Sequence, residues 1–309
     1  MYKKLLFGTV ILFLGFLYSC DNQNNSDPLA NIFSNLPDTT QLKELVNFLE
    51  ENQLDSIVQQ KKDDNIDRPI AIYPVLSPKD DVRKVVLDAS YLPEINVEYA
   101  DFRGSVFRSA KCPNSNFSHT DFRTADVRWT HFDNSDMRYS DFSQSKLFHV
   151  HVNHTDLSHS DFQGANMFGM EGHHAILRDC IFSNALMKDS EFLDSDFTGS
   201  TFVHVKLFRA VLKNSTLDSC DMSYCDFTGA RMENASFNHT RLWKSNMQGS
   251  HLQGADFTGA DLQGVNFFGA NFEKTNFKGA FNIPEVVKEM MDENGLVTGS
   301  WQDAGNSTY

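Results

Sequence analysis

The stretch that decides the fold is residues 249–279, GSHLQGADFTGADLQGVNFFGANFEKTNFKG, in which a large apolar residue returns at every fifth position. A helix repeats its faces about every 3.6 residues and a strand about every 2, so neither explains this period. Traced backward, the period keeps one register from Phe277 to Phe102, and 32 of these 36 positions are Phe, Leu or Met. The four exceptions are Cys112, Val127, Val152 and Gly172. The repeat unit is therefore five residues long.

A second register accompanies the first. The position two residues before each apolar one is Ala, Ser, Thr or Cys in 33 of 37 cases between Ala100 and Ala280. A chain that turns a corner every five residues would place the bulky and the small side chain inside and leave three positions facing outward. Such coils stack at the strand spacing of about 4.8 Å, and each covers its neighbour's open edge. The pattern predicts an all-β solenoid.

Residues 254–272, GADFTGADLQGVNFFGANF, resemble the pentapeptide repeat family, whose pattern is roughly Ala-(Asp/Asn)-(Leu/Phe)-x-x. The resemblance covers about 185 of the 309 residues. It implies a right-handed quadrilateral β-helix with four pentapeptides per coil, and hence about nine coils within residues 95–281. The family has no single function, so the resemblance implies a fold and leaves the activity open.

The N-terminus, MYKKLLFGTVILFLGFLYSC, is typical of a secretory signal. Lys3 and Lys4 precede an apolar stretch that is too short to span a bilayer as a permanent helix. The ending LYSC resembles a bacterial lipobox, which implies cleavage after residue 19 and a lipid on Cys20, although Tyr18 departs from the residue types usual at its position. An ordinary signal peptide and an uncleaved anchor are the alternatives. We therefore expect a lipid-anchored protein of the cell envelope, with inner membrane, outer membrane and cell surface all open.

The segments that flank the repeat divide the rest of the chain. Residues 21–28, DNQNNSDP, are polar and without apolar residues, which predicts a flexible tether over residues 20–38. Residues 39–94 combine amphipathic helical spacing with strand-like runs, which predicts a small mixed α/β cap at the N-terminal end of the β-helix. Residues 282–309 begin with a helix that starts near Pro284 and ends near Gly295, which would cover the last coil. The alternative for the N-terminal cap is a partner-binding module, and the alternative for the C-terminal helix is dimerisation.

A candidate binding surface comes from outward positions that are twenty residues apart. With four repeats per coil, residues that are twenty positions apart stack in one column along the β-helix. One such column contains Phe148, Phe168, Phe208 and Phe268, with Lys188, Thr228 and Gln248 between them. Stacked outward aromatic residues predict a strip that binds a protein or a glycan, although rings also stack simply to reduce their exposed area.

A candidate metal site comes from the same reasoning. His131, His151 and Glu171 share another column, within a histidine-rich region that continues over residues 149–174. These residue types can hold a transition metal, and a solvated face is the simpler interpretation. The repeat is least regular at residues 168–177, FGMEGHHAIL, which predicts a local bulge. A metal-binding protein or an enzyme that uses this stretch is the second functional hypothesis.

Other functions find less support in the sequence. Five arginines follow inward positions near acidic residues, which predicts ion-pair ladders rather than a nucleic-acid groove. They are Arg103, Arg108, Arg123, Arg128 and Arg138. No phosphate-binding loop, zinc-protease helix or nucleophile elbow is present, so we expect a non-enzymatic protein without a cofactor. The cysteine pair Cys220 and Cys225 is the one candidate for a disulfide.

Some cytoplasmic members of the resembled family mimic DNA and protect a topoisomerase from drugs. That role requires a strongly acidic surface and access to the cytoplasm. Residues 97–281 hold 17 basic and 22 acidic residues, so most of the net charge of −14 lies outside the repeats. Together with the export signal, this makes DNA mimicry the weakest of the alternatives. The sequence favours a rigid, membrane-tethered scaffold for envelope proteins or glycans.

Overall fold

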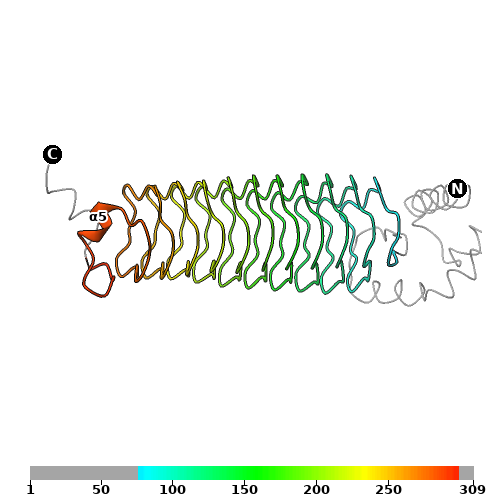
Figure 1. The fold of residues 1–309 in the computed structure, drawn as a ribbon. Coiled ribbons are helices and arrows are strands. Elements are labelled where there is room, and N and C mark those ends of the chain that lie inside the picture. Colours follow the sequence, from blue (N-terminus) through cyan, green and yellow to red (C-terminus); the bar gives the residue numbers. More distant parts are fainter. Residues whose placement is uncertain (1–75, 299–309) are drawn as a thin grey trace, which may run out of the picture. The chain divides into compact units, whose positions relative to one another are not determined.

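The computed structural model describes residues 76–298. Their backbone forms a stack of coils, in which parallel bridges join every fifth residue to the one twenty positions later, from Asp81↔Asp101 to Asp261↔Phe281. Figure 1 shows these coils following one another along a single axis. Each bridge is a single residue rather than a longer strand, because every side of a coil is only five residues long. Four pentapeptides therefore complete one turn.

The corners share one backbone conformation throughout the repeats. The two residues after each inward apolar position form a turn, and the second of them has a positive φ, as in Asn134 (58°), His154 (56°) and Gly164 (66°). A turn of this kind requires a left-handed residue, which glycine, asparagine and histidine adopt more readily than most. The chain changes direction at each of these turns, so each turn leads from one side of the coil to the next.

The core consists of the two inward registers. Six phenylalanines stack face to face along one inner side, with ring centroids 4.6–5.2 Å apart. They are Phe102, Phe122, Phe142, Phe162, Phe182 and Phe202. At the inward positions that hold Ala, Ser, Thr or Cys, hydroxyl and thiol groups donate hydrogen bonds to carbonyls of the preceding coil. Ser140 Oγ donates to Phe117 O (2.8 Å), and Cys225 Sγ donates to Phe202 O (2.8 Å). These bonds satisfy polar atoms that would otherwise be buried without a partner.

The structure corrects the predicted start of the β-helix. Residues 81–94, assigned above to a mixed cap, already follow the coil register, with Val82, Leu87 and Leu92 buried inside it. The sequence obscured this because the first coil has Val85 and Ile95 at small positions, where both side chains are only half-buried. The predicted signal peptide (1–19), tether (20–38) and the remainder of the cap (39–75) lie outside the described residues.

The predicted bulge near residue 172 is also wrong. The bridges His151↔Glu171 and Glu171↔Glu191 keep the register through this stretch. Gly172 occupies a position that elsewhere holds a large apolar side chain. A Cβ atom placed on it would lie 2.4 Å from Phe192 Cε1 and 3.1 Å from Val152 Cγ2, so these two neighbours fill the space. The irregular sequence therefore changes only the packing of side chains, and the backbone keeps the coil register.

At the C-terminal end, helix α5 spans Glu285–Lys288 and buries Val287. It is shorter than the predicted helix, because after Lys288 the backbone bonds span three residues, from Met290 N to Val287 O (3.0 Å) and from Met291 N to Lys288 O (3.2 Å). The carboxylate of Asp292 then accepts the backbone N–H groups of Asn294 and Leu296 (both 2.9 Å). Residues 295–297 then pair with the edge of the last coil. Phe277 N donates to Gly295 O (2.8 Å), and Val297 exchanges two bonds of 3.0 Å with the chain at 274–275.

Candidate functional site: an aromatic strip on a basic face

The coil register sorts the outward residues into four faces. One face consists of residues 106, 108 and 109 and the residues twenty, forty and more positions later, up to 206, 208 and 209. We call it the basic face. Over residues 101–220 it carries six basic and two acidic side chains, whereas each of the other three faces carries more acidic than basic ones. The basic residues are Arg108, Arg128, Lys146, Lys188, Lys206 and Arg209, and the acidic ones are Asp126 and Asp189.

An aromatic strip runs along the middle of this face. It consists of Trp129, Phe148, Phe168, Lys188 and Phe208. The Phe148 and Phe168 rings stack with centroids 4.8 Å apart, and the Trp129 ring meets Phe148 edge-on at 5.8 Å. Lys188 Nζ lies 5.7 Å from the Phe168 centroid and 5.6 Å from that of Phe208. The lysine thus connects two rings that the coil register separates by forty residues.

Three of the four predicted phenylalanines therefore belong to one contact chain. Phe268 does not join it, because Thr228 and Gln248 occupy the two coils between Phe208 and Phe268 in the same column. The Phe268 side chain is 61% exposed, whereas Phe148, Phe168 and Phe208 are half-buried. The contribution of Lys188 was missed at the sequence level, although its place in the same column was the available signal.

Stacking determines which part of each ring faces solvent. Phe168 has Phe148 over one face and the Lys188 ammonium over the other. The His149 ring packs edge-on against both phenylalanines, with its Nδ1 atom 3.1 Å from Gly169 O. A Cβ atom on Gly169 would lie 2.4 Å from His149 Cε1, so glycine is required for this packing. The strip presents ring edges and cationic groups, and its inner ring faces are covered.

The arginines at the two ends of the strip have local partners. Arg128 Nε lies 2.7 Å from Asp126 Oδ1, and Arg209 Nε lies 2.6 Å from Asp189 Oδ1. Hydrogen bonding from Arg209 lowers the pKa of Asp189. By contrast, Lys146, Lys188 and Lys206 make no ion pair within 4 Å to any described residue. Among the described residues, the lysines are therefore the basic side chains of this face that lack a close ion pair.

The residues proposed for a metal site are adjacent, but their contacts are pairwise. His131 and His151 stack with centroids 4.2 Å apart, His151 Nδ1 lies 3.2 Å from Glu171 Oε2, and His131 Nδ1 lies 3.5 Å from Asp133 Oδ2. Partial burial, followed by the charge of His151, lowers the pKa of His131. Within residues 76–298 there is no group of three or more His, Cys, Asp or Glu side chains placed to hold a metal ion.

Comparison with known protein families identifies pentapeptide repeats, in eight copies, at residues 100–138, 140–169, 173–203, 206–243 and 245–281. These ranges make up more than half of the chain. The chain belongs to the pentapeptide repeat family. This membership supports the right-handed β-helix that the resemblance implied, and the parallel bridges between residues twenty positions apart confirm four pentapeptides per coil.

Solved structures of other pentapeptide repeat proteins are similar to this one. HetL, involved in heterocyst differentiation regulation in the cyanobacterium Nostoc sp. Strain PCC 7120, is 21% identical, with 64% of this chain and 92% of HetL covered and a TM-score of 0.38. QnrB1, a plasmid-mediated fluoroquinolone resistance protein, is 18% identical, with 62% and 92% covered and a TM-score of 0.35. A search of curated proteins found no match to the chain.

The predicted ion-pair ladders of this pentapeptide repeat protein are confirmed. Arg103 Nε lies 2.8 Å from Asp101 Oδ1 on its own coil and 3.4 Å from Asp121 Oδ2 on the next. Arg123 bridges Asp121 and Asp141 in the same way. The pKa of Asp101 is lowered, chiefly by the hydrogen bonds from Arg103. These arginines are therefore already neutralised by neighbouring carboxylates.

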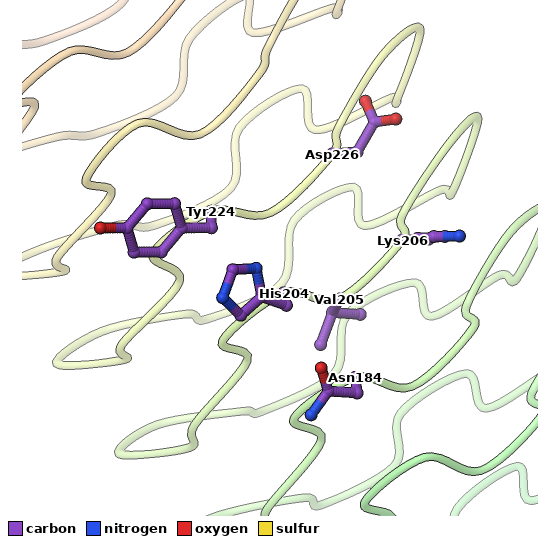
Figure 2. A pocket seen from close by; sticks show the side chains of 6 residues that line it. All are labelled: Asn184, His204, Val205, Lys206, Tyr224 and Asp226. Carbon is purple, nitrogen blue, oxygen red and sulfur yellow. The ribbon is translucent and has the colours of Figure 1, made fainter.

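Two further surface features of the pentapeptide repeats were missed from the sequence. Tyr99, His119, Tyr139 and His159 form a corner ladder of parallel rings with centroids 4.6–4.8 Å apart, and their spacing of twenty was the available signal. A shallow hollow lies at another corner, where the rings of His204 and Tyr224 stack 4.9 Å apart. Figure 2 shows these rings on one side of the chain and Lys206 and Asp226 on the other.

The four described cysteines are free and buried, so the candidate disulfide between Cys220 and Cys225 is absent from the structure. Burial raises the pKa of the Cys220 thiol to about 12. No helix among residues 76–298 is both long enough and apolar enough to span a bilayer.

Proposed function

We propose that this pentapeptide repeat protein is a non-enzymatic, lipid-anchored scaffold of the bacterial cell envelope, and that it binds a protein or a glycan through the aromatic strip. The lipobox-like LYSC ending at Cys20 supports the anchor. The single observation that supports the binding role is the strip itself. It is a continuous run of aromatic and cationic side chains on a surface whose other charges are mostly paired.

The strip has the composition of a protein-binding surface. Tryptophan and phenylalanine are enriched in the centres of protein interfaces, and aromatic rings fixed by their neighbours lose little conformational entropy on binding. A sugar ring, by contrast, stacks on the open face of an aromatic ring. The inner rings of the strip have no such face available, so we favour a protein over a glycan.

The anchor is tested by metabolic labelling with a clickable fatty acid. Labelling should be lost in Cys20→Ala and retained in Cys112→Ala, a matched cysteine substitution at a buried position of the repeats. Labelling that persists in Cys20→Ala would remove the lipoprotein hypothesis while leaving the binding strip untested by that result.

The strip is tested by photo-crosslinking in cells that express the full chain, with a photoreactive residue at position 228. A discrete adduct should disappear when Phe148, Phe168 and Phe208 are all replaced by Ser. The control replaces Tyr99, Tyr139 and Tyr224 by Ser, which removes three outward rings from other faces and should preserve the adduct. An adduct that survives the first triple variant would contradict the proposed site.

A further inference from the structure

We infer that the protein bound at the aromatic strip contributes an acidic, extended segment, which lies along the basic face between the coils of Lys146 and Lys206. This inference rests on the proposed function and specifies the chemistry of its partner. It is argued from three properties of the face: its charge, the state of its lysines and the orientation of its rings.

The charge of the basic face differs in sign from the rest of the β-helix. Six basic and two acidic side chains lie on it over residues 101–220, and the chain as a whole has a net charge of −14. Faces that carry mainly acidic residues repel an acidic partner, so only one side of the β-helix attracts it. Complementary charge of this kind selects partners and fixes their orientation.

The lysines provide binding capacity that the arginines lack. Arg128 and Arg209 already contact carboxylates of their own face, whereas Lys146, Lys188 and Lys206 have no ion pair within 4 Å among residues 76–298. Lys188 is the central one, and its ammonium lies between two phenylalanine rings. The rings remove water from part of this ammonium, which strengthens its attraction for an incoming carboxylate.

Ring orientation points to the same class of partner. An aromatic ring carries negative charge on its faces and positive charge at its edges. Because Phe148 and Phe168 stack with an interplanar angle of 9°, their edges are the part that can meet a ligand. Carboxylate and carbonyl oxygens are the complementary groups, and an extended acidic peptide supplies both.

The spacing sets the length of the segment. Lys146 and Lys206 share a column and are three coils apart, about 14 Å at the strand spacing. An extended peptide advances about 3.3 Å per residue, so four or five residues span this distance. Lys188 lies in the neighbouring column between them. A short acidic segment can therefore place a carboxylate near each lysine.

An anionic membrane is the main competing partner. Adsorption to a bilayer would use the same lysines, but it also gains from apolar rings that reach the acyl boundary. The phenylalanines of the strip are half-buried and fixed between their neighbours, so they are poorly placed to insert. These features favour a peptide, and the experiment includes a membrane arm.

The test uses the full chain with Cys20→Ala and fluorescence anisotropy of a labelled deca-glutamate peptide, with deca-glutamine as the uncharged probe. We expect binding of deca-glutamate only, which weakens as salt is raised. Replacing Lys146, Lys188 and Lys206 by Gln should weaken it roughly tenfold, since each exposed pair contributes a factor of a few. The matched variant, Lys84, Lys111 and Lys278 to Gln, removes three unpaired lysines from other faces and should change affinity less than twofold.

Equal affinity of the two triple variants would overturn the inference, as would binding of deca-glutamine. Lysine-dependent binding to phosphatidylglycerol vesicles without binding to deca-glutamate would overturn it in favour of a membrane surface. Circular dichroism verifies that each variant is folded. The proposed function is tested separately, because its crosslink depends on the phenylalanines. A crosslink that requires the phenylalanines but not the lysines would refute the acidic segment and leave the binding strip standing.

Discussion

Gly172 and Phe192 offer a direct test of how the coils pack. Gly172 occupies an inward position, and the ring of Phe192 from the next coil fills the space above it, with Cε1 and Cδ1 only 2.4 Å and 2.6 Å from where a Cβ would lie. Gly172→Ala must therefore displace the ring. Overpacking of this kind costs about 1–3 kcal/mol, offset by about 0.4–1 kcal/mol from the reduced freedom of the unfolded chain.

The partner substitution has a different cost. Phe192→Leu removes the edge-to-face contact with Phe197, whose centroid lies 5.3 Å away, and leaves some volume unfilled. We expect a loss of about 1–2 kcal/mol. In the double variant the alanine methyl occupies the vacated space, so its stability should match that of Phe192→Leu alone. The interaction free energy between the two sites is then about 1–2 kcal/mol, favouring the double variant.

The assay is urea unfolding followed by circular dichroism, with hydrogen exchange to localise the change. In a solenoid, a defect acts mainly on its own coil and the neighbouring ones, so faster exchange should be confined to residues near 152–192. Phe122→Leu, in another inner column and two and a half coils before Gly172, is the matched control and should be additive with Gly172→Ala. Additivity of Gly172→Ala and Phe192→Leu within about 0.5 kcal/mol would refute the reasoning.

Three further predictions concern the surface, the corners and the thiols. Arg103→Gln should lower the urea midpoint at pH 7. The pKa of Asp101 is lowered in the folded state, so the stability due to this pair is present above about pH 4 and lost as pH falls; a gap that persists at pH 2 would contradict this. Gly169→Ala should destabilise by about 1 kcal/mol more than Gly249→Ala, because both have a φ near 60° but only the first meets a neighbouring ring; equal urea midpoints would exclude the clash. Iodoacetamide should alkylate Cys220 at pH 8 only after unfolding, measured by mass spectrometry, because burial raises its pKa to about 12; rapid labelling of the folded protein would show an open coil.

Sequence periodicity was sufficient to predict the β-helix because the constraint repeats. Every corner needs a left-handed residue and every interior position a side chain of limited size, so the same pattern appears dozens of times. The ends were harder to predict. Residues 81–95 follow the register with Val85 and Ile95 at small positions, and a single coil contains too few repeats to show the rule. At the C-terminus, the helix ends at Lys288 and the chain continues in turns, which periodicity cannot indicate.

The spacing of twenty residues correctly predicted that Phe148, Phe168 and Phe208 share a column, because the bridges preserve that spacing. The spacing did not predict the conformations of the side chains within the column. Lys188 lies in the column as a polar interruption, yet its ammonium joins the rings on either side. A bulge was predicted around Gly172 because the sequence does not show that Phe192 reaches across the coil boundary. Contacts between coils depend on rotamers, which a one-dimensional pattern does not specify.

The twenty-residue register has a consequence for how this chain can change in length. Loss or gain of one pentapeptide preserves every corner and every interior position, but it rotates all later residues by a quarter turn. A deletion of five residues between Phe168 and Lys188 would send Lys188 and Phe208 to a different side from Phe148. Removing twenty would shorten the column and keep it aligned. Selection for a function carried by one side therefore permits changes by whole coils and opposes changes by single repeats.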